Sequence, residues 1–274
     1  MKITELRDYQ TDFEKNKANY NSEFKEINRL RKKFTIDYPI DEIINLTKDE
    51  YVIGKGDSTF CNRIENDLND WGNIHGSPAI KFGLYFGKYG KDKTRKYRIG
   101  RKEYGRDENI ALKKILSAII ELLQNKDDFE ILKKNPISPM YKGKILSVYY
   151  PDDFLNIFSA KHLNYFINIL GLDNDSKSEL DKQALLLSYK NNDEVMKEWR
   201  VYEFSKFLYK SFGNPNDEVK EDEISKELRD FRLKDFPPIE SLKFDYVDLQ
   251  TNELPQPRLQ TKNGTKCLFQ IIID

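Results

Sequence analysis

The stretch of sequence that decides the fold class covers residues 79–106 and is AIKFGLYFGKYGKDKTRKYRIGRKEYGR. It contains two short β-like runs, Ala79–Phe86 and Lys96–Ile99, with glycines around them. Glycine marks turns and close approaches of the backbone, and nine of the chain's thirteen glycines lie between residues 51 and 105. We therefore expect a small Gly-rich twisted sheet of two or three strands here.

Helical periodicity surrounds this region on both sides. Apolar side chains recur at three-, four- and seven-residue steps from Tyr9 to Leu30, which predicts an amphipathic helix over residues 4–34. Further helices are expected at residues 40–46, 58–70, 107–124, 159–170, 178–190 and 199–212. The run Ile145–Tyr150 is predicted to be a strand. The expected fold is α+β, with the small sheet flanked by helices and followed by a mostly helical subdomain.

Positive charge is concentrated around the β-like runs. Residues 81–106 carry ten basic side chains against two acidic ones, in a chain of zero net charge, and six aromatic residues are interleaved with them. Cations neutralise phosphates and aromatic faces stack on bases, which indicates a nucleic-acid interface. The expected contact residues are Lys81, Tyr85, Lys88, Lys93, Arg95, Lys96, Arg98, Arg101 and Lys102. The alternative is a solvated hairpin tip, because lysines at sheet edges also prevent aggregation.

Four segments follow from these patterns. They are an N-terminal amphipathic helix (1–35), an α/β nucleic-acid-binding region (36–150), a helical subdomain (151–235) and an extended C-terminal tail (236–274). The start of the chain has no apolar signal region and no apolar run is long enough to span a bilayer, so we expect a cytoplasmic protein without membrane contact and with reduced thiols.

Patterns for cofactor chemistry fail on spacing. The loop Gly54-Lys55-Gly56 lacks the Walker A spacing of a nucleotide-binding loop. The helix expected to begin near Ser58 could bind an anion at its N-terminus, or Ser58 could simply be its N-cap residue. The two histidines, His75 and His162, form no metal-ligand pair with the two cysteines, and a nucleophile at Cys61 lacks an orienting third group. We therefore expect no cofactor, no metal and no catalytic residue.

Two alternatives from other functional classes stay open. A metal-dependent nuclease would use Asp152 and Asp153, with Glu218-x-Lys220 as the second half of a carboxylate–lysine pattern, although Asp152 is also an N-cap candidate after Pro151. A protein-interaction adaptor would dock a partner on the Tyr9–Leu30 stripe and on the aromatic helix at 199–212.

Several blocks of the chain, in this order and spacing, resemble one known family. The blocks are Tyr51–Gly56, Trp71–Gly76, Lys81–Phe86, Pro136–Leu146, Asn156–Ser159 and Tyr202–Tyr209. Together they look like the N-terminal target-recognition region of McrB-type (MrcB N-terminal-like) restriction proteins, over residues 35–213. The resemblance implies a DNA-binding specificity module of a restriction or antiviral defence system, often directed at modified cytosine. It also implies a separate AAA+ motor or nuclease subunit as partner, since no Walker motif follows residue 213 in this chain.

Reading a modified base requires extrusion of that base into a pocket. The candidate pocket is the polar Trp71–Pro78 loop beside the basic hairpin. Its walls would be Trp71, Tyr85 and Tyr97, and its base-reading groups Asn73, His75 and Ser77. The alternative for Trp71 is packing in the core.

Overall fold

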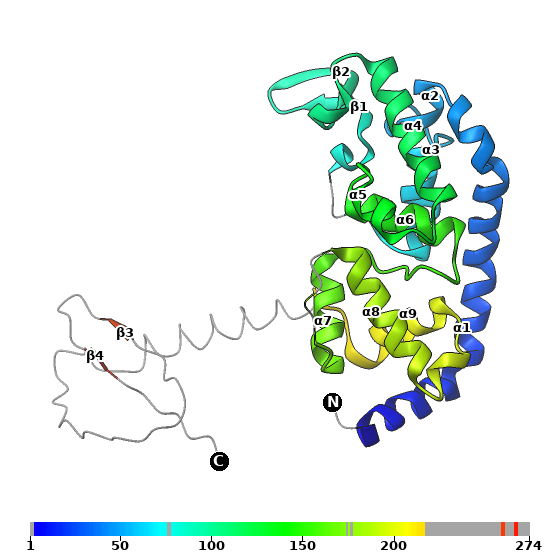
Figure 1. Ribbon diagram of the computed structural model, residues 1–274, viewed down its shortest axis with the longest axis vertical. Helices are drawn as coiled ribbons and strands as arrows, with labels where there is room; N and C mark the ends of the chain where they lie inside the picture. The colour runs from blue at the N-terminus through cyan, green and yellow to red at the C-terminus, as the bar shows by residue number, and fades with distance from the viewer. Residues whose placement is uncertain are drawn as a thin grey trace. The chain divides into compact units, whose positions relative to one another are not determined.

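The computed structural model describes residues 3–75, 78–173, 175 and 178–216, together with two short strands, β3 (Leu259–Gln260) and β4 (Lys266–Cys267). Residues Met1–Val219 form one compact unit, and residues Lys220–Asp274 form a second in which β3 pairs antiparallel with β4. The first unit is mostly helical with one small antiparallel sheet (Figure 1), which confirms the α+β class. The boundaries expected after residues 35 and 150 fall inside this unit. The end of the expected helical subdomain, after residue 216, and most of the expected extended tail lie outside the described residues.

The helix α1 (Ile3–Asp37) runs along one side of the first unit (Figure 1). Its 35 residues span about 52 Å at the rise of an α-helix. Within the predicted stripe Phe13 is buried in one hydrophobic cluster and Ile27 in another, whereas Tyr9 is 42% exposed. Leu6 and Phe34, outside the stripe, are buried in the same two clusters. One helix thus contributes to both cores of the unit.

The two clusters draw mainly on different helices, although Leu180 of α8 (Glu179–Asn192) and Tyr202 of α9 (Val201–Phe212) join the first cluster. The cluster at the C-terminal half of α1 takes side chains from η1 (Ile40–Asn45), α2 (Lys48–Tyr51), α3 (Phe60–Asn62), η2 (Arg63–Asp67), η3 (Asn69–Trp71), α4 (Glu108–Gln124), α5 (Phe129–Lys134) and α6 (Pro139–Tyr149). The cluster at its N-terminal half takes them from α7 (Ala160–Leu170), α8, η6 (Met196–Glu198) and α9. None of the helices in the described part combines the length and the apolarity that a bilayer crossing requires.

The strand predicted at Ile145–Tyr150 is wrong, because these residues belong to α6 and its C-cap. Pro139 occupies the first turn, where its missing N–H leaves no bond unmade, and the helix is buried on all sides from Tyr141 to Val148. A helix without a solvent face carries no 3.6-residue alternation, so its short apolar run looks like a buried strand.

Three other local predictions also need correction. Residues Ala79–Phe82 form the 3₁₀ turn η4, so the first strand begins only at Leu84. The helix expected from residue 58 starts after Thr59, whose side chain accepts from the Asn62 N–H, and it continues as the π-helical turn η2. Asp152 caps no helix, since residues 151–153 form a turn.

Candidate nucleic-acid interface

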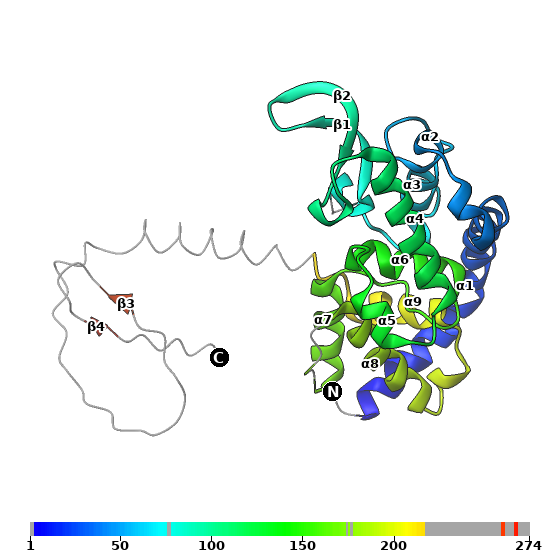
Figure 2. The same cartoon turned by 45° about the horizontal axis from the view of Figure 1, so that its top comes forward.

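The basic stretch folds into a hairpin that projects from the helical body (Figures 1 and 2). Strands β1 (Leu84–Tyr89) and β2 (Asp92–Ile99) pair antiparallel, with Phe86 opposite Tyr97 and an irregularity between Gly87 and Tyr89. Gly90 in the tight connection has φ +54°, a left-handed conformation that favours glycine. Burial falls along β1 from the root, Leu84, to the exposed tip.

The exposed tip is strongly cationic. Among residues 88–96 five side chains are basic and exposed, and Asp92 is the only acid: Lys88, Lys91, Lys93, Arg95 and Lys96. Tyr89 places an aromatic ring beside them with 59% of its surface exposed. Lys102 is also exposed, beyond the end of β2. Of the expected contact residues, the fold thus presents five outward: Lys88, Lys93, Arg95, Lys96 and Lys102.

Lys81, Arg98 and Arg101 are instead held by acceptors of the protein itself, and the exposed Lys96 also pairs with Asp92 at 3.1 Å. Lys81 is buried and forms an ion pair and hydrogen bond with the buried Glu65. The Arg98 side chain, 14% exposed, pairs with Asp92 at 2.9 Å, donates to the Gly87 carbonyl at 2.8 Å and holds the pKa of Asp92 well below its usual value. A side chain committed to internal acceptors has few donors left for phosphate.

Arg101 and Tyr85 also turn toward the protein. The Arg101 guanidinium pairs with Glu103 at 2.8 Å and donates to the Pro136 carbonyl at 2.6 Å. Tyr85 is 6% exposed, so its ring packs at the hairpin root and offers little face for stacking on a base. The interface expected from the sequence therefore shrinks to the tip.

One face of the hairpin carries a cluster of cations on aromatic rings. Phe86 and Tyr97 lie edge to face with ring centroids 5.3 Å apart, and the Lys55 ammonium lies 4.5 Å and 5.2 Å from these two centroids. The Tyr97 hydroxyl donates to the Asp49 carboxylate and lowers the pKa of that carboxyl. Arg95 lies over Phe86 at 5.5 Å. Tyr97 is thus held in place by contacts within the chain.

The loop that carries Lys55 supports the hairpin from one side. The Ile53 carbonyl accepts from the Phe86 N–H at 3.0 Å, and the Gly54 carbonyl accepts from Arg95 at 2.5 Å. Gly54 has φ +95°, and a Cβ there would collide with the Phe86 carbonyl. The Lys48 ammonium lies 4.6 Å from the Tyr97 ring centroid. Sequence reasoning missed Lys48, Asp49 and Lys55 as neighbours of the hairpin, because contacts between residues so far apart in sequence leave no local pattern.

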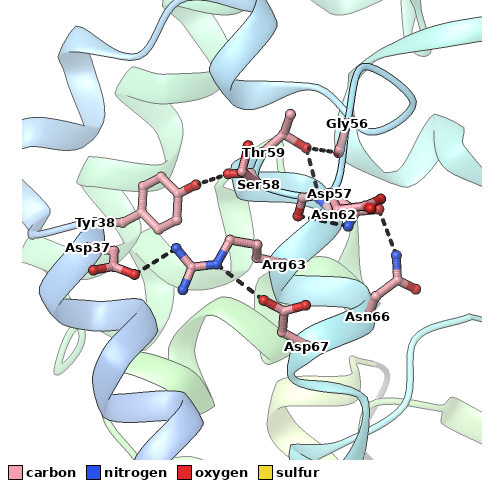
Figure 3. A network of polar contacts seen from close by, with 10 residues as sticks. All are labelled: Asp37, Tyr38, Gly56, Asp57, Ser58, Thr59, Asn62, Arg63, Asn66 and Asp67. Atoms are coloured by element: carbon pink, nitrogen blue, oxygen red, sulfur yellow. Dashed lines mark hydrogen bonds and ion pairs between the residues drawn. The ribbon is translucent and has the colours of Figure 1, made fainter.

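A polar network fastens the same loop to the end of α1 (Figure 3). The Tyr38 hydroxyl donates to the Ser58 carbonyl at 2.7 Å. Arg63 reaches Asp37 at 2.8 Å and Asp67 at 3.2 Å. The helix that follows Thr59 is only three residues long, so the anion site considered at this helix start has no support. These contacts hold in place the loop that supports the hairpin.

The residues proposed for a base pocket do not share one cavity. Trp71 is 1% exposed, and its indole N–H donates to the Ser147 hydroxyl at 3.2 Å. Trp71 therefore packs in the core, which was the alternative to a role in the base pocket. The cavity that Trp71 and Asn73 line includes neither His75 nor the hairpin tyrosines. His75 lies with its Nδ1 3.7 Å from Glu65. Ser77 lies outside the described residues.

Other chemistry finds little support in the described part of the chain. No group of three or more His, Cys, Asp and Glu side chains there could hold a metal ion. Asp153 forms an ion pair with Lys126 at 2.8 Å, and Glu218 lies outside the described residues. Cys61 is fully buried, and burial raises the pKa of its thiol to about 12, which disfavours the nucleophilic thiolate.

The two surfaces considered for an adaptor pack against each other. Phe13 of α1 contacts Phe207 of α9 with centroids 5.6 Å apart, and Phe24 contacts Tyr202 at 5.0 Å. Each aromatic stripe therefore has its partner within the same chain.

No protein-family model, curated protein or solved structure matches this chain.

Proposed function

We propose that this chain is a DNA-binding specificity module whose β1–β2 tip contacts backbone phosphates. It would act with a separate AAA+ motor or nuclease subunit of a restriction or anti-phage defence system, as its resemblance to McrB-type N-terminal regions implies. In that setting the target would be a modified base such as a modified cytosine.

The observation that carries the proposal is the charge of the projecting tip. Five exposed cations and one acid lie within nine residues, in a chain of zero net charge. Each phosphate that such cations neutralise releases condensed counterions, which favours binding. A two-stranded ribbon also has the width to enter the major groove of B-DNA. The exposed ring of Tyr89 adds a stacking surface for an unpaired base.

The test is duplex binding across a salt series. Replacing Lys88, Lys91, Lys93 and Lys96 with Gln removes four cations of the tip. Since each lost phosphate contact reduces the slope of log K against log salt by about 0.9, this variant should lose a slope of about 3 to 4 and most of its affinity. Changing Lys15, Lys25, Lys134 and Lys197 to Gln removes the same charge from exposed sites elsewhere and should leave the slope unchanged.

Equal affinity and slope in the tip variant and the wild type would remove the proposal. The target is tested separately, with otherwise identical duplexes that carry cytosine, methylcytosine or hydroxymethylcytosine. Indifference to the modification would leave DNA binding intact and remove modified-base recognition.

A further inference from the structure

A second group of cations lies along α1, which occupies the side of the first unit away from the hairpin tip (Figures 1 and 2). These cations line an open groove of about 810 Å³ between α1 and the residue that precedes α9. Five of its nine lining residues are basic, and none of the nine is acidic. The five are Lys25, Arg29, Lys32, Lys33 and Arg200. Sequence reasoning assigned no role to them.

The helix places these cations in a row. Lys25, Arg29 and Lys32 follow one another at steps of four and three residues, so they lie on successive turns of one helix face. Lys33 extends the row to about 12 Å along the axis, at a rise of about 1.5 Å per residue. All four side chains, and that of Arg200, are exposed. The row can therefore meet a polyanion without any rearrangement of the helix.

The carboxylates in this half of α1 leave most of the row unpaired. Glu23 and Asp37 form ion pairs with cations outside the groove. Glu26 pairs with Arg29 at 2.6 Å, so Arg29 is only partly available to a ligand. The other four cations of the groove form no ion pair within the described part of the chain: Lys25, Lys32, Lys33 and Arg200.

The groove also presents flat and apolar surface beside the row. The Arg200 guanidinium lies over the Phe24 ring, 4.7 Å from its centroid, and remains exposed. Exposed guanidinium planes are surfaces on which nucleobases stack. Ile36, another lining residue, is 75% exposed. Cations for phosphates and surfaces for bases thus lie side by side.

We propose that this groove binds single-stranded DNA. Proteins that hold single strands combine a positively charged groove, which follows the backbone, with side chains on which bases stack. Small-molecule sites enclose about 300–1,000 Å³, so a groove of about 810 Å³ accommodates a few nucleotides of one strand. A duplex is too wide to enter it. The rival occupant, an acidic protein segment, would use the cations but leave the stacking surface of Arg200 without a partner.

The site is separate from the hairpin tip, and only the choice of DNA over RNA rests on the proposed function. Selection of RNA requires a partner for the 2′-hydroxyl. Of the side-chain carboxamide oxygens in the lining, Asn28 Oδ1 already accepts from Arg31 at 2.8 Å, and Asn21 Oδ1 is buried. The side chains of the groove therefore offer a ribose hydroxyl no free acceptor.

Fluorescence anisotropy on the full chain tests this site, with a labelled oligodeoxythymidylate of about 12 nucleotides as the probe. The measurement uses the tip variant, so that the hairpin does not contribute. In this background Lys25→Gln, Lys32→Gln, Lys33→Gln and Arg200→Gln together should raise the Kd about tenfold or more. Since each phosphate contact of a single strand contributes about 0.7 to the slope of log K against log salt, the slope should fall by about 2 to 3.

Two controls separate the loss of the groove from a loss of charge or of packing. Lys15→Gln, Lys113→Gln, Lys134→Gln and Lys197→Gln together remove the same charge from exposed sites outside the groove and should leave the Kd unchanged. A variant that changes only the three groove lysines keeps the contact between Arg200 and Phe24 and should still raise the Kd about fivefold. In otherwise wild-type protein, the groove substitutions should leave duplex affinity unchanged.

Equal Kd values in the groove variant and its matched control would overturn the proposal, as would the absence of saturable binding of the single strand to the tip variant. Tighter binding of an oligouridylate of the same length would reject the assignment to DNA. Tighter binding of a polyglutamate peptide would identify an acidic protein segment as the partner and would also overturn the proposal. Because the hairpin is disabled in every single-strand measurement, failure here is distinguishable from failure of duplex binding at the tip.

Discussion

The buried ion pair between Lys81 and Glu65 predicts a large loss of stability from a substitution that looks harmless in the sequence. Lys81 belongs to the same basic stretch as the exposed tip lysines, yet its side chain is 3% exposed and that of Glu65 8%. In Lys81→Met the Glu65 carboxylate stays buried without its ammonium partner. His75 Nδ1 lies 3.7 Å from the same carboxylate, but an imidazole replaces the ammonium only when it is protonated.

Removing one partner of a buried ion pair costs about 3–5 kcal/mol, because the remaining charge is left uncompensated. With a urea m-value of about 3 kcal/mol/M, this loss corresponds to a fall of about 1–1.7 M in the unfolding midpoint. The matched control is Lys88→Met, which removes an exposed lysine of the tip and should change the free energy of unfolding by about 0.5 kcal/mol or less. Equilibrium urea unfolding followed by circular dichroism measures both.

A double variant isolates the pair from the loss of packing. Lys81→Met with Glu65→Met replaces both charges by apolar side chains, an exchange that is often nearly neutral, so stability should return to within about 1 kcal/mol of wild type. This double variant should also bind DNA as the wild type does, since Lys81 does not reach the surface. The reasoning is refuted if Lys81→Met is as stable as Lys88→Met, or if the double variant stays as unstable as the single one.

Three further outcomes follow from buried or constrained groups. Gly83→Ala should destabilise the protein by about 2–5 kcal/mol, because φ at Gly83 is +78° and a Cβ there would lie 2.8 Å from both Ile115 and Tyr104. Gly90 has open space around it, so Gly90→Ala should lower the free energy of unfolding by only about 1 kcal/mol in the same urea assay. In a Cys267→Ser background Cys61 should resist a thiol reagent at pH 8 until urea unfolds the protein, because burial raises the pKa of its thiol to about 12. Burial lowers the pKa of Lys142 to about 8, below its value of about 10.4 in an unfolded chain, so the folded state loses the Lys142 proton first and stability should rise with pH between these values. Lys142→Met should lack that rise in pH-dependent urea titrations, and an identical pH profile in both proteins would contradict the assignment.

Local signals in the sequence located most helices. Thr47 and Glu50, three positions apart as a capping box requires, form that box at the start of α2, and the helix expected at residues 107–124 becomes α4. Both depend on residues within a few positions of each other, which a sequence displays directly. The same reasoning fails for α6, where burial on every side removes the alternation that distinguishes a helix from a strand.

The candidate interface was predictable only in part, because the sequence does not show which cations are buried or paired within the folded chain. Composition alone groups Lys81, Arg98 and Lys93 as equivalent cations, but their environments differ. Glu65 neutralises Lys81 from 16 positions away, and Asp92 pairs with Arg98 of the same strand, β2, at 2.9 Å. Lys93 is exposed because the other end of the hairpin is held against the body of the protein. Residues 53–59 contribute to that attachment, and they lie more than 30 positions before Lys93 in the sequence.

The long helix α1 has a consequence for dissecting the protein. Since its two halves complete two separate apolar interiors, no cut near residue 150 yields a fragment with a finished core. A product that lacks α1 would expose both interiors at once, and a shortened helix would leave one of them open. Genetic dissection of this unit should therefore retain residues 3–216 together. Point substitutions on an intact chain are the better way to test the role of the hairpin.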